Sequence, residues 1–381
     1  MFDTKEQRAQ TRHREAELIR YYGGHTLAFF GLAPKNGHFL APGGEGLVSY
    51  RLAGNVAVVL GDPVCAPQAF EQVTRSFLDF CALHDWRVAF YQAYPEPLTT
   101  YRALNLRSFK MGEEAIIHPQ TFTLHGSAIA NVRTSCRHAE REGVIIHWYD
   151  GVPPAAVMQQ LEHISGAWLE RKAGKHASEM GFSTGRLDEL VDMAEQAEMV
   201  ASISRLSTVS HQGAPWLVTA VATTSAGKAC AFVTFLPLYG FSDGEETVKG
   251  VGWGWTLDMM RRAPDAPPGV MELLLVRAIE RFQLCGAHIV SLGMVAMADT
   301  RQEMTPVQRQ LAHFVSDRMR LLESRHTLFN FKQKFHPCWE SRYVVINSTL
   351  ALPKIALAVL RIRNYAGGRS GSLFLNAVAG V

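Results

Sequence analysis

An acidic and a basic side chain stand three residues apart in the second half of the chain, at Asp258 and Arg261. The run 247–256 (TVKGVGWGWT) before them predicts a strand, so we expect Asp258 at the strand end and Arg261 one turn later, at the start of a helix. A carboxylate that opens from a strand end into a cleft suits binding of an ammonium group, or general-base catalysis if burial raises its pKa. The alternative is a salt bridge between the two residues that only closes a loop.

Two further carboxylates, Asp265 and Glu272, flank the turn Pro267–Pro268–Gly269. One interpretation places Asp265 at the mouth of a substrate pocket, with Glu272 close by. The other is structural, because Glu272 in a first helical turn would complement the helix dipole and Asp265 is a common turn residue.

A basic set near the C-terminus is interleaved with aromatic residues: Lys332, Lys334 and Arg342 among Phe331, Phe335 and Trp339. The alternation Phe331, Gln333, Phe335 predicts a strand with aromatic rings on one face and both lysines on the other. Cations beside stacking surfaces suit a single-stranded nucleic-acid end, and lysines also bind phosphate as point charges. The alternative is a half-buried strand with solvated lysines. Lys334 is the strongest single candidate of this set.

A second cationic set lies on the predicted helix 127–142, where Arg133, Arg137 and Arg141 recur every four residues. Like charges at this spacing repel each other, so the stripe favours an anionic partner such as a nucleic-acid or lipid phosphate. Glu140 and Glu142 could instead neutralise it as part of a solvated charged face.

Arg51 and Asp62 stand at two strand ends of a predicted hairpin, 46–51 and 56–60 with the turn Ala53–Gly54–Asn55. They either line an inner cleft or form an internal ion pair. Among the other chemically active residues, the histidines show no His at i+4 and the six cysteines form no C-x-x-C pair. We therefore expect no metal site.

The 381 residues include 38 Lys and Arg, 35 Asp and Glu, and 47% hydrophobic residues, with a formal net charge of +3. This balance excludes a largely disordered chain and a uniformly basic nucleic-acid coat, so any polyanion must bind a local patch. The charged N-terminus lacks the apolar core of a signal peptide, and no apolar run reaches the roughly 20 residues that span a bilayer. We expect a cytoplasmic protein without a spanning anchor.

The elements that must position these residues follow the same predicted order twice, about 190 residues apart. The first copy has strands 46–51 and 56–60, helix 67–84 and strand 87–92, and the second has strands 229–236 and 247–256, helix 270–284 and strand 288–292. This order is that of the centre of a GNAT-type acyltransferase, in which two strands of a mixed sheet splay to admit an acyl donor. An acetyl-CoA enzyme would carry a Gly-rich turn at the helix N-terminus to hold the pyrophosphate. Residues 264–269 (PDAPPG) instead remove N–H donors and add a negative charge, which disfavours acetyl-CoA.

Several segments in order, over about residues 25–350, resemble the catalytic domain of the lysylphosphatidylglycerol synthases, also called multiple peptide resistance factors. These segments are Glu113–Ala115, Thr121–Leu124, Asn131–Arg133, His138–Gly143, Trp168–Leu169, Gly181–Arg186, Leu257–Arg261, Pro264–Met271, Ser291–Met294, Phe331–Phe335 and Trp339–Tyr343.

The resemblance implies an α/β (α+β) fold of two tandem GNAT-like subdomains, 1–145 and a catalytic 146–350, with mixed, mostly antiparallel sheets flanked by helices. It implies transesterification from aminoacyl-tRNA to the glycerol hydroxyl of phosphatidylglycerol, an anionic membrane lipid, at the inner face of the cell membrane, with neither a metal nor acetyl-CoA. The resemblance also implies that Asp258, Arg261 and Lys334 are catalytic. The expected substrate-binding residues are Arg51, Asp62, Arg133, Arg137, Arg141, Asp265, Glu272, Lys332 and Arg342.

The multi-pass flippase region usual at the N-terminus of this family is not in the sequence, which leaves export of the product and the acceptor open. The alternatives are another lipid or soluble acceptor, or a non-catalytic protein that binds tRNA or membrane. No motif identifies the amino acid.

The tail 351–381 begins with an amphipathic pattern in residues 351–363, and residues 364–381 are expected to be loose. Ile355, Val359 and Ile362 fall on one helical face, and Lys354, Arg361 and Arg363 supply positive charge. The helix either lies at a membrane surface through this apolar face or packs that face against the protein's own sheet.

Overall fold

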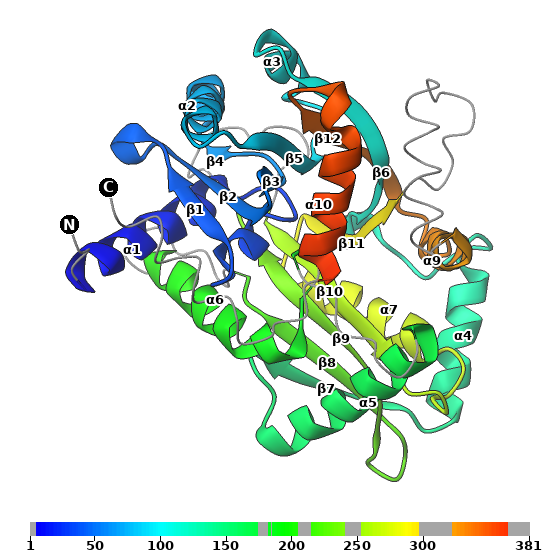
Figure 1. Ribbon diagram of the computed structural model, residues 1–381. Coiled ribbons are helices and arrows are strands. Elements are labelled where there is room, and N and C mark those ends of the chain that lie inside the picture. The colour runs from blue at the N-terminus through cyan, green and yellow to red at the C-terminus, as the bar shows by residue number, and fades with distance from the viewer. Residues whose placement is uncertain are drawn as a thin grey trace.

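The computed structural model describes residues 5–173, 182–183, 185–204, 215–240, 253–296 and 322–364, and Figure 1 shows how its elements are arranged. The strands form one 12-stranded sheet in the order β1-β2-β3-β5-β12-β6-β11-β10-β9-β8-β7, with β4 paired to β2. Their bounds are β1 Gly37–Leu40, β2 Gly46–Ala53, β3 Val56–Leu60, β4 Val64–Cys65, β5 Arg87–Ala93, β6 Arg107–Ile117, β7 Ile145–Asp150, β8 Val218–Thr223, β9 Ala229–Leu238, β10 Gly254–Arg262, β11 Ile289–Ala296 and β12 Cys338–Ile346. The α-helices are α1 Lys5–Tyr22, α2 Phe70–Leu83, α3 Leu98–Ala103, α4 Ala130–Arg141, α5 Ala155–Ala173, α6 Leu190–Ser204, α7 Val270–Leu284, α9 Leu322–Gln333 and α10 Leu352–Asn364.

The first half is built on the predicted hairpin. Strands β2 and β3 pair antiparallel, with Ala53 opposite Val56, and the turn between them uses Gly54 at a φ of 62°, a backbone conformation that glycine adopts without strain. Alternate residues of β3 then reach opposite faces of the sheet. Val56, Val58 and Leu60 join the core under α10, whereas the residues between them join the core under α2.

The two halves repeat the predicted order of strands and helices. Strand β3 pairs antiparallel with β2 and, after α2, parallel with β5. Strand β10 likewise pairs antiparallel with β9 and, after α7, parallel with β11. All residues of β9 are buried, because α5 and α7 both pack on this strand. The predicted fold class, a mixed and mostly antiparallel α/β arrangement flanked by helices, is confirmed.

Strand β12 connects the halves. It comes from the range assigned above to the second subdomain, 146–350, yet it pairs antiparallel with both β5 and β6 of the first. Strand β6 in turn pairs with β11 of the second half. The two repeats are therefore joined through one continuous sheet.

Two predicted elements near the candidate residues need correction. Strand β10 begins at Gly254 and continues to Arg262, so Asp258 and Arg261 both lie inside a strand rather than at its end and on a helix; residues 247–252 of the predicted strand lie outside the described part. Residues Phe331–Gln333 end helix α9 and do not form a strand. The reason is that Phe331 and Phe335 are four residues apart, a spacing that also brings side chains together around a helical turn. The centroids of their rings lie 5.7 Å apart.

Helix α10 lies in front of the sheet in Figure 1 and packs on β2 and β3. Its residues Ile355 and Ile362 are only 2% and 5% exposed and belong to the core. The apolar face that could have entered a membrane is thus buried against the protein's own sheet, which is the second of the two predicted alternatives. Within the described ranges, no helix is both long and apolar enough to cross a membrane.

Candidate active site

The second repeat opens where its two parallel strands part. Strands β10 and β11 are paired only from Gly254 to Thr256 opposite Ile289 to Ser291. Gly254 is needed for this contact, since a Cβ there would lie 1.8 Å from the carbonyl oxygen of Ile289. Beyond the paired stretch, both strands show register shifts, between Leu257 and Met259 and between Ser291 and Met294. A cavity of about 360 Å³, here called the central cavity, lies at this divergence.

The central cavity is lined by residues from distant parts of the chain. Strands β10 and β11 contribute 256–261 and 292–296. The remaining walls come from the segment after α1, the end of β5, Glu114 of β6, Ser183, and helices α5, α9 and α10. The cavity has the location predicted for a splayed acyltransferase sheet.

Asp258 occupies the irregularity in β10 and lines the central cavity. Its carboxylate accepts hydrogen bonds from the backbone N–H of Gly185 and from the hydroxyl of Thr234, the latter at 3.0 Å. Gly185 allows this approach, because a Cβ would lie 2.2 Å from a carboxylate oxygen of Asp258. Both carboxylate oxygens are therefore held in place by hydrogen-bond donors.

Arg261 also lines the central cavity and is 5% exposed. Its guanidinium donates a hydrogen bond to the hydroxyl of Ser165 and lies over the ring of Trp168, at 5.2 Å from the ring centre. Both partners belong to α5, so Arg261 anchors this helix to β10.

Lys332 enters the central cavity from α9 and is 4% exposed. Its ammonium group donates to the carbonyl oxygens of Gly293 at 2.9 Å and Met294 at 3.4 Å. Burial lowers the pKa of Lys332 to about 7, although the negative charge of Glu114 partly opposes this shift. A lysine with such a pKa exchanges its proton near neutral pH, as a general base or acid must.

A buried network holds the carbonyl that Lys332 contacts. Arg342 and Glu114 form an ion pair at 2.6 Å with side chains 0% and 2% exposed. The other carboxylate oxygen of Glu114 accepts a hydrogen bond from the hydroxyl of Ser291, and that hydroxyl accepts the backbone N–H of Gly293 at 2.9 Å. Gly293 has a φ of 84°, which turns its carbonyl toward Lys332. The network fixes the bend of β11, and Arg342 acts inside it rather than at the cavity wall.

Glu114, Ser291, Gly293 and Thr234 were missed as site residues by the sequence reasoning. The first three lie in segments that carry the family resemblance, but their partners are distant: Glu114 and Arg342 are 228 residues apart. A buried carboxylate in a strand is the signal that could have indicated a cationic partner.

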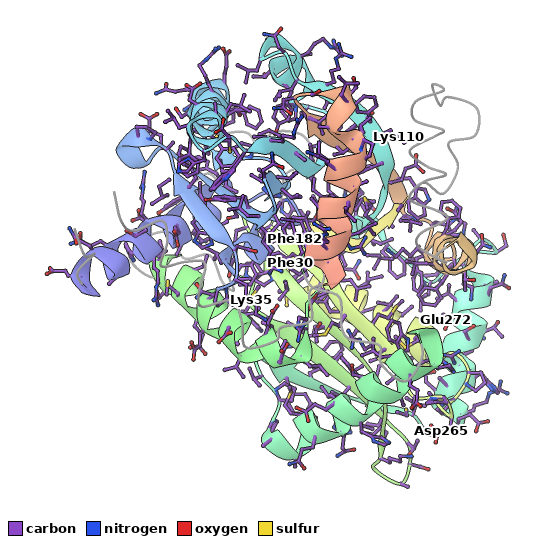
Figure 2. All side chains as sticks on the ribbon, in the orientation of Figure 1. Phe30, Lys35, Lys110, Phe182, Asp265 and Glu272 are labelled. Atoms are coloured by element: carbon purple, nitrogen blue, oxygen red, sulfur yellow. The ribbon has the colours of Figure 1, made fainter. Side chains whose placement is uncertain are left out.

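The other predicted residues around α7 lie outside the central cavity. Asp265 has a side chain 70% exposed and lies 3.5 Å from the ammonium of Lys228. Lys334 binds the carboxylate of Glu272 at 2.8 Å and lies over the ring of Phe331. Figure 2 shows Asp265 at the lower edge of the molecule, far from Phe30 of the cavity wall. The prediction that Asp265 lies at the pocket mouth is therefore wrong in position.

The arginine stripe of α4 is divided between two environments. Arg133 donates to the carbonyl oxygens of Leu124 and Gly126 and so closes the preceding loop. Arg137 and Arg141 remain exposed and line an open depression on the surface. Glu140, a possible neutralising residue, instead pairs with Arg277 of α7 at 2.6 Å.

Arg51 and Asp62 do not meet and do not line the central cavity. Arg51 donates to the side chain of Asn36 at 2.7 Å and lies over the ring of Phe182. Asp62 is buried, accepts from the backbone N–H of Tyr94 and the hydroxyl of Tyr101, and has its pKa raised by burial to about 6. Among the described residues, each side chain is thus held by partners other than the expected one, and neither is in the lining of the central cavity.

The turn before α7, where a GNAT enzyme binds the coenzyme pyrophosphate, packs closely against α4. Gly269 packs so closely on α4 that a Cβ would lie 2.1 Å from the carbonyl oxygen of Ser135. The first turn of α7 also presents the carboxylate of Glu272. A carbonyl and a carboxylate at this place are unfavourable neighbours for a diphosphate. For metals, the described residues include no group of three or more His, Cys, Asp or Glu side chains that could hold an ion.

Comparison with known proteins places this geometry in a family. The profile described as "Phosphatidylglycerol lysyltransferase, C-terminal" matches residues 16–346. The chain belongs to this family. The predicted resemblance is thereby confirmed, over nearly the range inferred from the motifs.

Two curated relatives and one solved structure show how far the similarity extends. The chain is 27% identical over 350 residues to "Phosphatidylglycerol lysyltransferase" of Bacillus subtilis (strain 168), which covers 92% of this chain and 36% of that protein. It is 25% identical over 352 residues to "Lysylphosphatidylglycerol biosynthesis bifunctional protein LysX" of Mycobacterium sp. (strain JLS), at 90% and 29% coverage. The chain thus spans about a third of the length of these relatives. The structure of L-PGS from Bacillus licheniformis shares the fold, with a TM-score of 0.73, 24% identity, and coverage of 93% of this chain and 96% of that one.

Proposed function

We propose that this member of the phosphatidylglycerol lysyltransferase family transfers an aminoacyl group from aminoacyl-tRNA to the glycerol hydroxyl of phosphatidylglycerol. The observation that carries the proposal is the central cavity, which brings the Asp258 carboxylate and the buried Lys332 amine together between the splayed strands β10 and β11. The name of the Bacillus subtilis relative supports the same reaction class.

Asp258 is the group suited to bind the α-ammonium of the aminoacyl donor. Its two oxygens are held by Gly185 and Thr234, so the carboxylate is already in position without a substrate. Because the carboxylate is already ordered, less conformational entropy is lost when the substrate binds. The donor's ester carbonyl would then be fixed at a short distance from the ammonium site, inside the central cavity.

Lys332 is suited to move the proton in the transfer step. The neutral amine accepts the proton of the lipid hydroxyl as its oxygen attacks the ester carbonyl, which forms a tetrahedral oxyanion. When the carbon–oxygen bond to the terminal ribose breaks, the resulting ammonium returns this proton to the leaving ribose oxygen. Arg261 lines the same cavity and supplies a positive charge for the oxyanion. One ester is exchanged for another, so the step balances without a further reactant.

The surface around α4 and α9 has features that suit the tRNA donor. Arg137 and Arg141 are exposed cations on α4. The rings of Phe329 and Trp339 stack with their centroids 4.7 Å apart, and Lys334 lies between these two residues in the sequence. His336, in the turn after α9, bonds to the carbonyl of Ala128 just before α4 and so brings the two regions together (Figure 1). Cations next to partly exposed aromatic rings are typical of surfaces that bind single-stranded nucleotides.

An acetyl-CoA-dependent reaction is the main enzymatic competitor that the fold allows. The turn before α7 argues against it, because Gly269 packs there against the carbonyl oxygen of Ser135 and the first turn of α7 carries the carboxylate of Glu272. We expect calorimetric titration of the protein with acetyl-CoA to give no binding heat. A saturable heat with 1:1 stoichiometry would contradict the proposed donor.

The ammonium site can be tested with Asp258→Asn. Loss of a charge-assisted contact to the donor should reduce kcat/KM for charged tRNA roughly 10- to 150-fold, while the amide oxygen preserves a hydrogen bond to Gly185 or Thr234 and hence the fold. The matched control is Asp265→Asn, which alters an exposed carboxylate outside the cavity and should retain activity. Equal activities of the two variants, with unchanged circular dichroism, would remove Asp258 from the site.

The reaction itself is tested by incubating the protein with pooled aminoacyl-tRNAs and a mixed lipid extract. Unbiased mass spectrometry of the extracted lipids should reveal an aminoacylated phosphatidylglycerol that is cleaved by mild base. The same spectra identify the amino acid. A product on another lipid or on a soluble molecule would correct the acceptor, and binding of tRNA without any product would indicate a non-catalytic protein.

A further inference from the structure

Helix α10 has a second face, opposite to the one packed on the sheet, that carries both leucines and cations. Leu350, in the turn that leads into the helix, is 91% exposed, and Leu357 is 39% exposed. Lys354 and Arg361 are exposed on the same side, because residues 350, 354, 357 and 361 follow the three- and four-residue spacing of one helical stripe. These four residues are called the α10 outer face below.

The charged residues of the α10 segment itself have one sign. Residues 347–364 contain Lys354, Arg361 and Arg363 and no Asp or Glu. Exposed leucines flanked by cations are the composition of helices that lie in the interface of an anionic bilayer, where leucine side chains enter the acyl region and cations meet phosphates. The packed inner face, with Ile355 and Ile362 in the core, holds the helix in a fixed orientation for such docking.

The α10 outer face is also close to the cavity where the proposed reaction takes place. Arg363, at the C-terminal end of α10, lines the central cavity, and Lys332 lines the same cavity from α9. In Figure 1, α10 runs in front of the sheet and its C-terminal end reaches the level of β10. A membrane held against the outer face would therefore lie against a helix whose C-terminal end forms part of the cavity wall.

We propose that the α10 outer face docks this protein on an anionic phospholipid surface and presents the central cavity to the lipid head groups. This inference rests on the proposed function for the identity of the acceptor, but the docking itself can be measured without catalysis. The partner is a lipid bilayer rather than a second copy of the chain, because two copies of a face with only cations would repel each other.

The first test is sedimentation of the full-length protein with phosphatidylcholine vesicles that contain roughly 30–40% phosphatidylglycerol, which makes the vesicle surface strongly negative. Lys354→Gln/Arg361→Gln should lower the partition coefficient about 25-fold, at about fivefold for each lost cation. Leu350→Glu/Leu357→Glu should lower it at least about tenfold. Wild-type binding should fall strongly on vesicles of phosphatidylcholine alone.

Matched controls are available on other helices. Leu83 and Leu284 are 84% and 89% exposed on α2 and α7, so Leu83→Glu/Leu284→Glu introduces the same change elsewhere. Arg75→Gln/Arg102→Gln removes two cations from α2 and α3. Both controls should bind vesicles like wild type. Equal binding of the outer-face variants and wild type, or an equal loss in the controls, would overturn the proposal, as would a dimer in light scattering that the same variants dissociate.

Activity measurements separate this inference from the proposed function. If both hold, the outer-face variants should transfer little to phosphatidylglycerol in vesicles but retain wild-type transfer to a short-chain phosphatidylglycerol dissolved as monomers. If the proposed function is wrong, wild type itself transfers to neither substrate, while the difference in vesicle binding persists. If transfer to vesicles is unchanged in the outer-face variants of an active enzyme, docking through α10 is wrong.

Discussion

Replacing Lys332 by methionine should lower kcat for aminoacyl transfer roughly 10²- to 10⁴-fold, the contribution of a positioned general base. The fold should remain, because methionine fills a similar volume and the cost of burying an amine is removed. Lys332→Arg is the sharper variant, since arginine keeps the positive charge but does not give up its proton in proteins. If Lys332 accepts a proton, both variants should be inactive to a similar degree.

The pH dependence gives an independent readout of the same group. The pKa of Lys332 is lowered to about 7, so below this pH the amine is mostly charged and unable to accept a proton. Wild-type kcat/KM should therefore fall about tenfold for each pH unit below the pKa. The residual activity of Lys332→Met should lack this limb, and the exposed control Lys228→Met should retain it together with full activity. Full activity of Lys332→Met, or an unaltered acidic limb, would contradict the role.

Removal of the buried cation at position 342 should have the largest effect on stability. In Arg342→Met, the carboxylate of Glu114 loses its ion-pair partner at 2.6 Å in a fully buried place. Breaking a buried pair on one side costs about 3–5 kcal/mol in the free energy of unfolding. Urea denaturation followed by circular dichroism measures this loss. The bend of β11 that carries Gly293 depends on the same carboxylate, so transfer activity should fall as well.

The double variant Glu114→Gln/Arg342→Met distinguishes a lost partner from lost packing. It removes both charges, so it should be more stable than Arg342→Met alone. Arg75→Met serves as a surface control, because Arg75 and Glu71 form an exposed pair whose loss should cost about 1 kcal/mol or less. A loss in Arg342→Met no greater than in Arg75→Met would refute the buried ion pair as a major source of stability.

The repeated fold could be predicted because its signals are local. The turn at Gly54, the helical spacing in 270–284 and the apolar strands are each read within about fifteen residues of sequence. The position of β12 could not be predicted in this way. Its insertion between β5 and β6 is a pairing across more than 200 residues, and its alternating side chains would suit several places in the sheet.

The candidate site was predicted in part. Asp258 and Arg261 do share the central cavity, but on a strand with an irregular register rather than across a strand end. Lys334 is the stronger candidate of the sequence analysis, whose strand interpretation places both lysines on one face, and the segment 331–335 has both a two-residue and a four-residue period. The helical period places Lys332 inside, where its burial lowers its pKa, and leaves Lys334 to pair with Glu272. The choice between the two lysines depended on the type of element, which this short segment does not determine.

The most direct test of the account is transfer of radiolabelled amino acid from charged tRNA to phosphatidylglycerol vesicles, with and without prior ribonuclease treatment. We predict a labelled lipid that is released by mild base, that requires intact charged tRNA, and that is nearly absent with Lys332→Met. Label in the lipid fraction that survives ribonuclease, or no labelled lipid with any charged tRNA, would contradict the central claim.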